Sequence, residues 1–147
     1  MQMKELILVE YDEGERRLKL MFQDCVLPQP RQTANSRFRP QGDSKGEQIR
    51  RYNEKQAELK KILMLALKQA GIKGLLFEKG EAVGFASSFW TKRADRADLS
   101  NFEKSAEDFC NGVVYHDDVQ IFKRGEGEKI KDEKENMLIQ VWAVRPD

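Results

Sequence analysis

Hydrophobic and polar side chains alternate along the first part of the chain. A period of two residues is typical of a strand that buries one face. Residues 4–11 and 16–26 are therefore predicted to be strands. The polar residues 12–15 between them, which include Gly14, predict a hairpin turn, so the chain is expected to begin with two paired strands.

A helical period replaces this alternation at residues 47–70. Apolar side chains recur there about every 3.6 positions, which predicts a long helix. Gly71 and Gly74 provide its C-terminal stop. Residues 28–46 contain three of the four prolines and many polar side chains, so they are predicted to form a long loop before the helix.

The second half of the chain alternates strands with one shorter helix. Residues 74–92 are predicted to form either two strands or one strand and an irregular piece, because a glycine separates two apolar runs. Residues 101–111 are predicted to form a helix that ends at Gly112. Ser100 and Glu103 have the spacing of a capping box, which places the start of this helix at the serine.

Two further strands complete the predicted order of elements. They lie at residues 118–123 and 137–144, with a charged, solvated loop at 125–136. The order β-β-α-β-β-α-β-β predicts an α/β (α+β) fold, in which two helices pack on a mixed β-sheet of about five to six strands. The 147 residues fit a single domain spanning 1–147.

Charge is distributed unevenly, although the formal net charge is only +1. Residues 31–73 hold 11 Lys/Arg against 4 Asp/Glu, a net of +7, whereas residues 98–118 hold 1 Lys against 6 Asp/Glu, a net of −5. A polyanion would bind the first segment and metal cations the second. The charges alone are equally consistent with ordinary solvated helix faces.

Composition also bears on the compartment. Cys25 and Cys110 lie far apart and form no CxxC motif, so both are expected to be reduced, core-type residues. Acidic residues interrupt the first apolar run early, which argues against a signal peptide, and no apolar stretch approaches about 18 residues. We therefore expect a soluble, cytoplasmic protein with no membrane partner.

The residues with the clearest chemistry lie between 96 and 123. Asp98 precedes the second helix, Lys104 lies on it, and Asp118 follows a glycine turn at the next strand. The turn brings the helix entry and the strand entry together, so that Asp98 and Asp118 can face one pocket. Converging carboxylates suit Mg²⁺, and a nearby lysine can stabilise charge on a phosphate. Surface Asp and Lys near helix ends are also common without any function.

This segment resembles the signature of the RusA family of Holliday junction resolvases. The resemblance rests on Asp-Leu-x-Asn-x-x-Lys at 98–104, then Asp108, then Asn-Gly-x-x-Tyr-x-Asp-Asp-x-Gln-Ile at 111–121. The loop Arg37-Phe38-Arg39-Pro40 loosely resembles an Arg/Pro-rich segment of that family. The resemblance covers roughly residues 16–144, which leaves 1–15 as an additional N-terminal strand.

The resemblance implies a function and roles for individual residues. It implies a structure-selective DNA endonuclease that resolves four-way junctions with Mg²⁺, or with Mn²⁺ as an alternative. Asp98 and Asp118 would be catalytic metal-binding carboxylates, and Lys104 the active-site lysine. The positions that would support the site are Ser100, Asn101, Asp117 and Gln120. Family membership also implies a homodimer, which agrees with the two-fold symmetry of a four-way junction, and a frequent association with phages.

One position departs from the family pattern. The family usually has an aspartate where this chain has Ser100, so one carboxylate is missing. Asp117, Glu103 or Asp95 would replace it after a small shift, or the site would bind Mg²⁺ more weakly through fewer contacts. A third reading is a catalytically impaired protein that still binds branched DNA.

Basic side chains in the loop and at the start of the first helix are the candidates for DNA phosphate contacts. They are Arg37, Arg39, Lys45, Arg50 and Arg51. Contacts of this kind are salt-sensitive and largely independent of DNA sequence. An interaction domain that binds no DNA is the alternative of a different class.

Overall fold

The computed structural model describes residues 6–30 and 43–144. Strands β1 (Leu6–Asp12) and β2 (Arg17–Gln23) form the expected antiparallel hairpin. The residue with positive φ beside its turn is Arg16, at 50°. The Arg16 guanidinium forms an ion pair with the carboxylate of Glu81, which holds the arginine side chain in place.

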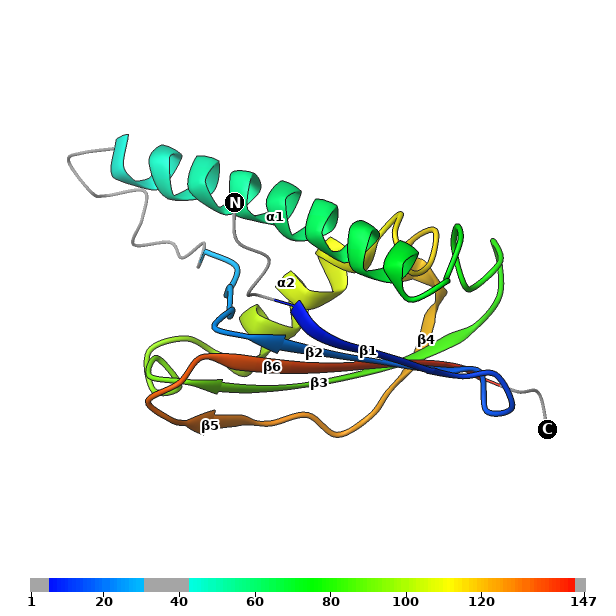
Figure 1. Cartoon of the computed structure of the whole chain (residues 1–147). Helices are drawn as coiled ribbons and strands as arrows, with labels where there is room; N and C mark the ends of the chain where they lie inside the picture. The colour runs from blue at the N-terminus through cyan, green and yellow to red at the C-terminus, as the bar shows by residue number, and fades with distance from the viewer. Residues whose placement is uncertain (1–5, 31–42, 145–147) are drawn as a thin grey trace.

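Within the described ranges, six strands form one mixed sheet (Figure 1). The remaining strands are β3 (Val83–Thr91), β4 (Ile121–Arg124), β5 (Lys129–Lys131) and β6 (Asn136–Ala143). The order β1-β2-β6-β3-β4 is antiparallel up to β3, whereas β4 and β5 both run parallel to β3. They pair with its first and last residues, so together they form one interrupted edge of the sheet.

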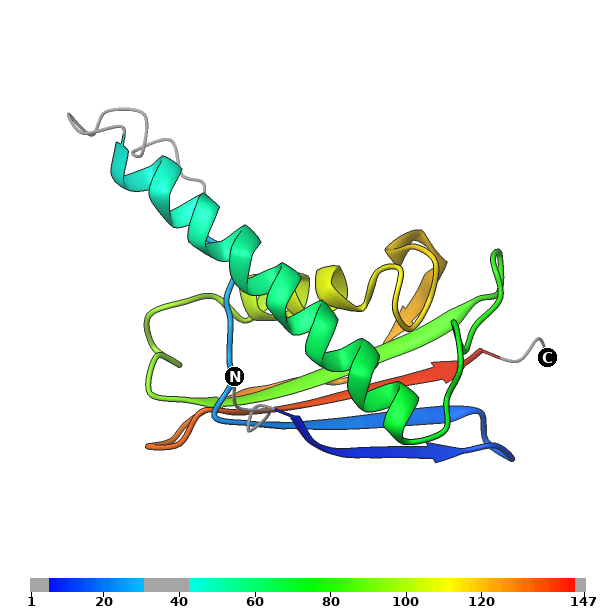
Figure 2. The ribbon, with the colours of Figure 1, turned by 45° about the horizontal axis from the view of Figure 1, so that its top comes forward.

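Both helices lie on the same face of the sheet (Figures 1 and 2). They are α1 (Asp43–Gln69) and α2 (Leu99–Cys110). Alternate residues of the central strands point at the helices and are fully buried, because this face is the only one covered in the described part of the chain. The core includes Leu18, Leu20, Phe22, Phe85, Phe89, Met137, Ile139 and Val141 from the strands, with Leu59, Leu63, Phe102, Ala106 and Phe109 from the helices.

The opposite face of the sheet carries half-exposed and polar side chains. The Arg17 guanidinium stacks 4.4 Å from the ring centroid of Trp142. The indole in turn lies over Gly84, where an added Cβ would meet ring atoms at 2.2 Å. A glycine is required at this position because the ring occupies the space of its side chain.

The predicted fold class is confirmed; one open alternative is decided and two elements are corrected. Residues 74–92 contain only one strand, β3, so the reading as one strand and an irregular piece was right. The segment 125–136 is not only a solvated loop, because it contains the strand β5. This strand pairs with β3 through backbone hydrogen bonds, which its charged side chains gave no reason to predict. The start of the segment 118–123 is the 3-10 helix η2 (Asp118–Gln120), and the strand begins at Ile121.

No helix in the described ranges is both long and apolar enough to span a bilayer.

Candidate functional site

Helix α2 begins earlier than the capping box predicted. The N-cap is Asp98, whose backbone is extended (φ −70°, ψ 146°) and whose carbonyl accepts from the amide of Asn101 at 3.0 Å. The Asp98 side chain makes no capping hydrogen bond. The prediction that Ser100 caps the helix was wrong, because the serine already has a helical backbone and lies in the first turn, exposed.

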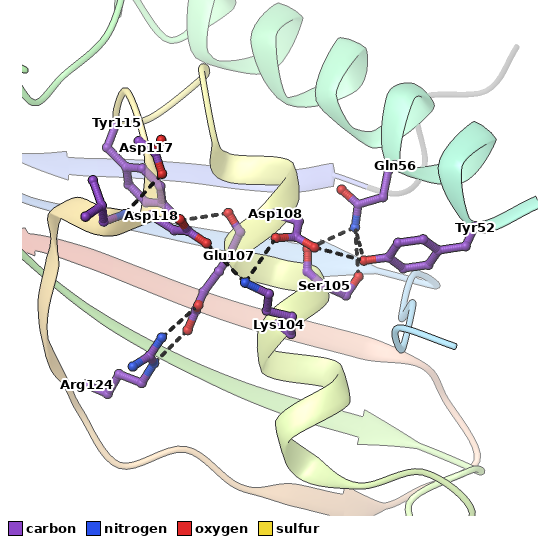
Figure 3. A network of polar contacts seen from close by, with 11 residues as sticks. Tyr52, Gln56, Lys104, Ser105, Glu107, Asp108, Tyr115, Asp117, Asp118 and Arg124 are labelled. Atoms are coloured by element: carbon purple, nitrogen blue, oxygen red, sulfur yellow. Dashed lines mark hydrogen bonds and ion pairs between the residues drawn. The ribbon is translucent and has the colours of Figure 1, made fainter. Parts of the chain in front are cut away.

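Lys104 extends from α2 to two carboxylates (Figure 3). Its Nζ lies 3.2 Å from Oδ2 of Asp118 and 3.8 Å from Oδ1 of Asp108. The bond to Asp118 raises the pKa of Lys104, so the side chain is an ammonium at neutral pH. The pKa of Asp118 is lowered, first by the neighbouring carboxyl of Asp117 and then by Lys104, whereas burial raises that of Asp108. The predicted lysine and one predicted catalytic carboxylate are therefore in direct contact.

The turn that carries Asp118 is held by two of the predicted supporting residues. The Asp117 side chain accepts from the amide of Val119 at 3.1 Å and caps η2. The Gln120 side chain is 4% exposed and accepts from the amides of His116 and Asp117 at 2.8 and 3.1 Å. Its Nε2 donates to two carbonyls of the segment before β3, at 2.8 and 2.9 Å. Gln120 thus fixes the position from which Asp118 approaches α2.

A buried acid on α2 binds an arginine on β4. The Glu107 side chain is only 2% exposed, and its two oxygens accept from Nε and Nη2 of Arg124 at 2.8 and 2.9 Å. Such a bidentate pair is among the stronger polar contacts in proteins. It joins α2 to the strand that follows Asp118, which stabilises the relative position of Lys104 and Asp118.

A second polar network joins α1 to α2 behind the lysine (Figure 3). The Gln56 Nε2 donates to Oγ and O of Ser105 at 2.9 and 3.0 Å and to Oη of Tyr52 at 3.0 Å. The Tyr52 hydroxyl reaches Oδ2 of Asp108 at 3.4 Å, and burial raises its pKa to about 12. Asp108 therefore lies between the long helix and Lys104.

A cleft of about 370 Å³ opens beside α2. It is lined by Gln29, Ser100, Asn101, Glu103, Lys104, Glu107 and Arg124. Three of the predicted site residues, Ser100, Asn101 and Lys104, line it, whereas Asp98 and Asp118 do not. Asp98 is exposed at the start of α2, about 9 Å before Lys104 along the helix axis.

The fold matches the one expected from the motif, and comparison with known protein families identifies the family. A family model for endodeoxyribonuclease RusA matches residues 28–141. The chain belongs to the RusA family. No curated protein matches the sequence. Membership makes the chain one of the nucleases of Holliday junction resolution and DNA recombination. The match begins after β2, so the β1–β2 hairpin precedes the RusA region.

The side chains of the candidate site supply only some of the oxygen ligands that a hard cation such as Mg²⁺ needs. In residues 6–30 and 43–144, no three acidic, histidine or cysteine side chains lie close enough together to hold a metal ion. Mg²⁺ commonly uses one or two protein carboxylates and completes its shell with water and substrate phosphate. Asp118 fits that smaller requirement because its carboxyl is ionised at neutral pH, and Asp98 offers a second, exposed carboxyl at the start of α2.

The predicted DNA contacts are only partly visible. Arg37 and Arg39 lie outside the described residues, and the side chain of Lys45 is likewise not described. Arg50 and Arg51 are exposed on the first turns of α1, where both pair with Glu47 at 3.1 and 3.5 Å. These turns extend beyond the sheet (Figure 2), so a long nucleic acid can reach them.

Several residues of the site escaped the sequence reasoning. Gln56 interrupts an otherwise apolar stripe of α1, and that interruption was a usable signal for a buried polar contact. The pair of Glu107 and Arg124 had no such signal, because the two residues are 17 positions apart and meet only through packing of α2 against the sheet edge.

Proposed function

We propose that this RusA-family chain is a structure-selective endodeoxyribonuclease that resolves four-way junctions by paired, metal-dependent cuts. We further propose that it acts as one domain per subunit, in a homodimer, on DNA in the cytoplasm. The contact of Lys104 with Asp118 carries the proposal, because it joins the two halves of the motif in space. Two matched sites related by a two-fold axis suit a substrate with the same symmetry.

The chemistry follows from the charges of the site. Lys104 remains an ammonium and therefore stabilises negative charge on the scissile phosphate rather than accepting a proton. Asp98 and Asp118 would hold Mg²⁺ (or Mn²⁺). The metal, when bound, polarises the phosphate and lowers the pKa of a water molecule. Asp108 is a second carboxylate beside the Lys104 ammonium, so the ammonium keeps an acidic neighbour when Asp118 turns toward a cation.

DNA arms would be held by the basic segment before and within α1. Arg50 and Arg51 support this proposal by their exposure, and Arg37, Arg39 and Lys45 extend it from the sequence. Each phosphate contact steepens the dependence of binding on salt.

A second candidate is a catalytically impaired protein that binds branched DNA. Two observations favour it: Ser100 is exposed in the cleft where the family has an aspartate, and the described residues gather no three-ligand metal centre. Ser100→Asp tests this candidate directly. A gain of cleavage in the variant over an inactive wild type would establish it.

The experiment for the main proposal uses a labelled four-way junction and a linear duplex, with Mg²⁺, Mn²⁺ or chelator. Paired symmetric nicks that need metal and spare the duplex are expected. Asp118→Asn should abolish cleavage and retain junction binding. Asp132→Asn is the matched control, since Asp132 is exposed and does not line the cleft. Undiminished cleavage by Asp118→Asn would refute the site.

A further inference from the structure

The arginine on β4 is held in an unusual way for an exposed side chain. Arg124 is 58% exposed, yet two of its donors, on Nε and Nη2, are fixed by the nearly fully buried carboxylate of Glu107. A guanidinium carries five N–H donors in a rigid fork. The remaining donors, including both on Nη1, have no hydrogen-bond acceptor among the described residues and belong to the exposed side of the group.

The position of this arginine places it beside the site. Arg124 and Lys104 line the same cleft, together with two acidic side chains, Glu103 and Glu107, and the neutral side chains of Gln29, Ser100 and Asn101. Because two donors of the guanidinium bind Glu107, the remaining donors of Arg124 and the ammonium of Lys104 are the positively charged groups of the cleft. A planar fork matches the oxygens of a phosphate group in two parallel bonds.

We propose that Arg124 is a substrate-binding residue that contacts a DNA phosphate in this cleft, and that Glu107 is the positioning residue that orients it. The inference rests on the proposed function, since it takes DNA as the substrate. It adds a second cation to Lys104 and explains why a carboxylate is buried in α2 opposite an exposed arginine.

Other acids face the guanidinium as well. Glu103 and Asp118 both act on Arg124 through space and, with Glu107, keep its pKa raised. Asp118 is bound by Lys104, and burial beside Glu107 raises the pKa of Glu103. A phosphate bound in the cleft therefore contacts Arg124 through the donors that Glu107 leaves unbound.

Two variants separate phosphate contact from a purely structural ion pair. Arg124→Lys keeps a charged partner for Glu107, but a single ammonium bound there has no fork left for phosphate. The double variant Glu107→Gln with Arg124→Gln replaces the ion pair by a neutral amide pair and avoids an unpaired buried charge. Lys123→Gln is the control, because Lys123 is an exposed cation on the same strand that does not line the cleft.

The measurement is the affinity for a four-way junction in chelator across a series of salt concentrations, with the melting temperature of each variant. Arg124→Lys and the double variant should bind about tenfold more weakly, as loss of a charge-assisted hydrogen bond implies. The slope of log affinity against log salt should become shallower by about one. Lys123→Gln should change affinity less than threefold.

Two results would overturn the inference. The first is that both Arg124→Lys and the double variant bind the junction with the affinity and the salt dependence of the wild type, whether or not their melting temperatures fall. The other is an equal loss in Lys123→Gln, which would reveal a general charge effect. Failure of the proposed function is distinguishable, because it shows in the wild type as absence of junction cleavage, whatever the variants do to binding.

Discussion

The single side chain on which the geometry of the site most depends is Gln120, and its replacement by alanine has a calculable cost. Its amide nitrogen donates to the carbonyls of Glu78 and Glu81, and its oxygen accepts from the amides of His116 and Asp117. Gln120→Ala deletes all four hydrogen bonds at once. It also separates the turn that carries Asp118 from the segment before β3.

The magnitude follows from the count of bonds and the exposure of their partners. A hydrogen bond contributes about 1 kcal/mol on average, so four sum to about 4 kcal/mol. The backbone groups are only partly buried, and water will satisfy some of them in the variant. We therefore expect a loss of about 2–4 kcal/mol in the free energy of unfolding. For a chain of this size that corresponds to a melting temperature lower by roughly 5–15 °C.

Urea unfolding and a thermal scan measure this loss, with Gln140→Ala as the control. Gln140 is a half-buried glutamine of β6 that accepts one hydrogen bond, from Arg17 at 3.1 Å, and its removal should cost less than about 1 kcal/mol. Gln120→Glu should be at least as harmful at neutral pH, because it sets a carboxylate against two carbonyls. Since burial raises the pKa of the introduced carboxyl, stability should recover as the pH falls. An equal or smaller loss in Gln120→Ala than in Gln140→Ala would refute the reasoning.

Three further predictions follow from other contacts. Gly84→Ala should displace the ring of Trp142 and cost about 1–3 kcal/mol, measured by urea unfolding and tryptophan fluorescence, and an unchanged spectrum would contradict it. Asp118 should titrate below 3.8 by NMR; its ionised form then contributes stability above that pH, and the contribution is lost as the pH falls through its lowered pKa. A pKa above 3.8 would show that its lysine contact does not persist in solution. Burial raises the pKa of Cys110, so a thiol reagent should modify Cys25 in the native protein and Cys110 only after unfolding, and early loss of both thiols would argue against the packed core.

Much of the architecture was predictable because it depends on local pattern. The β1–β2 hairpin, the long helix and β6 all have periods that identify the face they bury, and the mixed sheet with two helices follows from their order. The family was equally accessible, since its motif at 98–121 is a matter of residue identity and spacing.

Elements defined by their neighbours were not predictable in this way. The strand β5 is three residues long and charged, and it exists because β3 offers an unpaired edge after β4 ends. The start of α2 also differs from the prediction. The capping box placed it at Ser100, whereas the N-cap is Asp98 and the first helical residue is Leu99.

The candidate site divides along the same line. The sequence by itself determined which residues are candidates for the chemistry: Lys104 and Asp118 in one motif, with Ser100 where the family pattern has an aspartate. Only the tertiary structure decided which groups touch, because packing of α2 against β4 and α1 brings together side chains that are distant in sequence. Glu107 binds Arg124 for that reason. A contact of this kind has no local period, since it depends on where two separately folded elements meet.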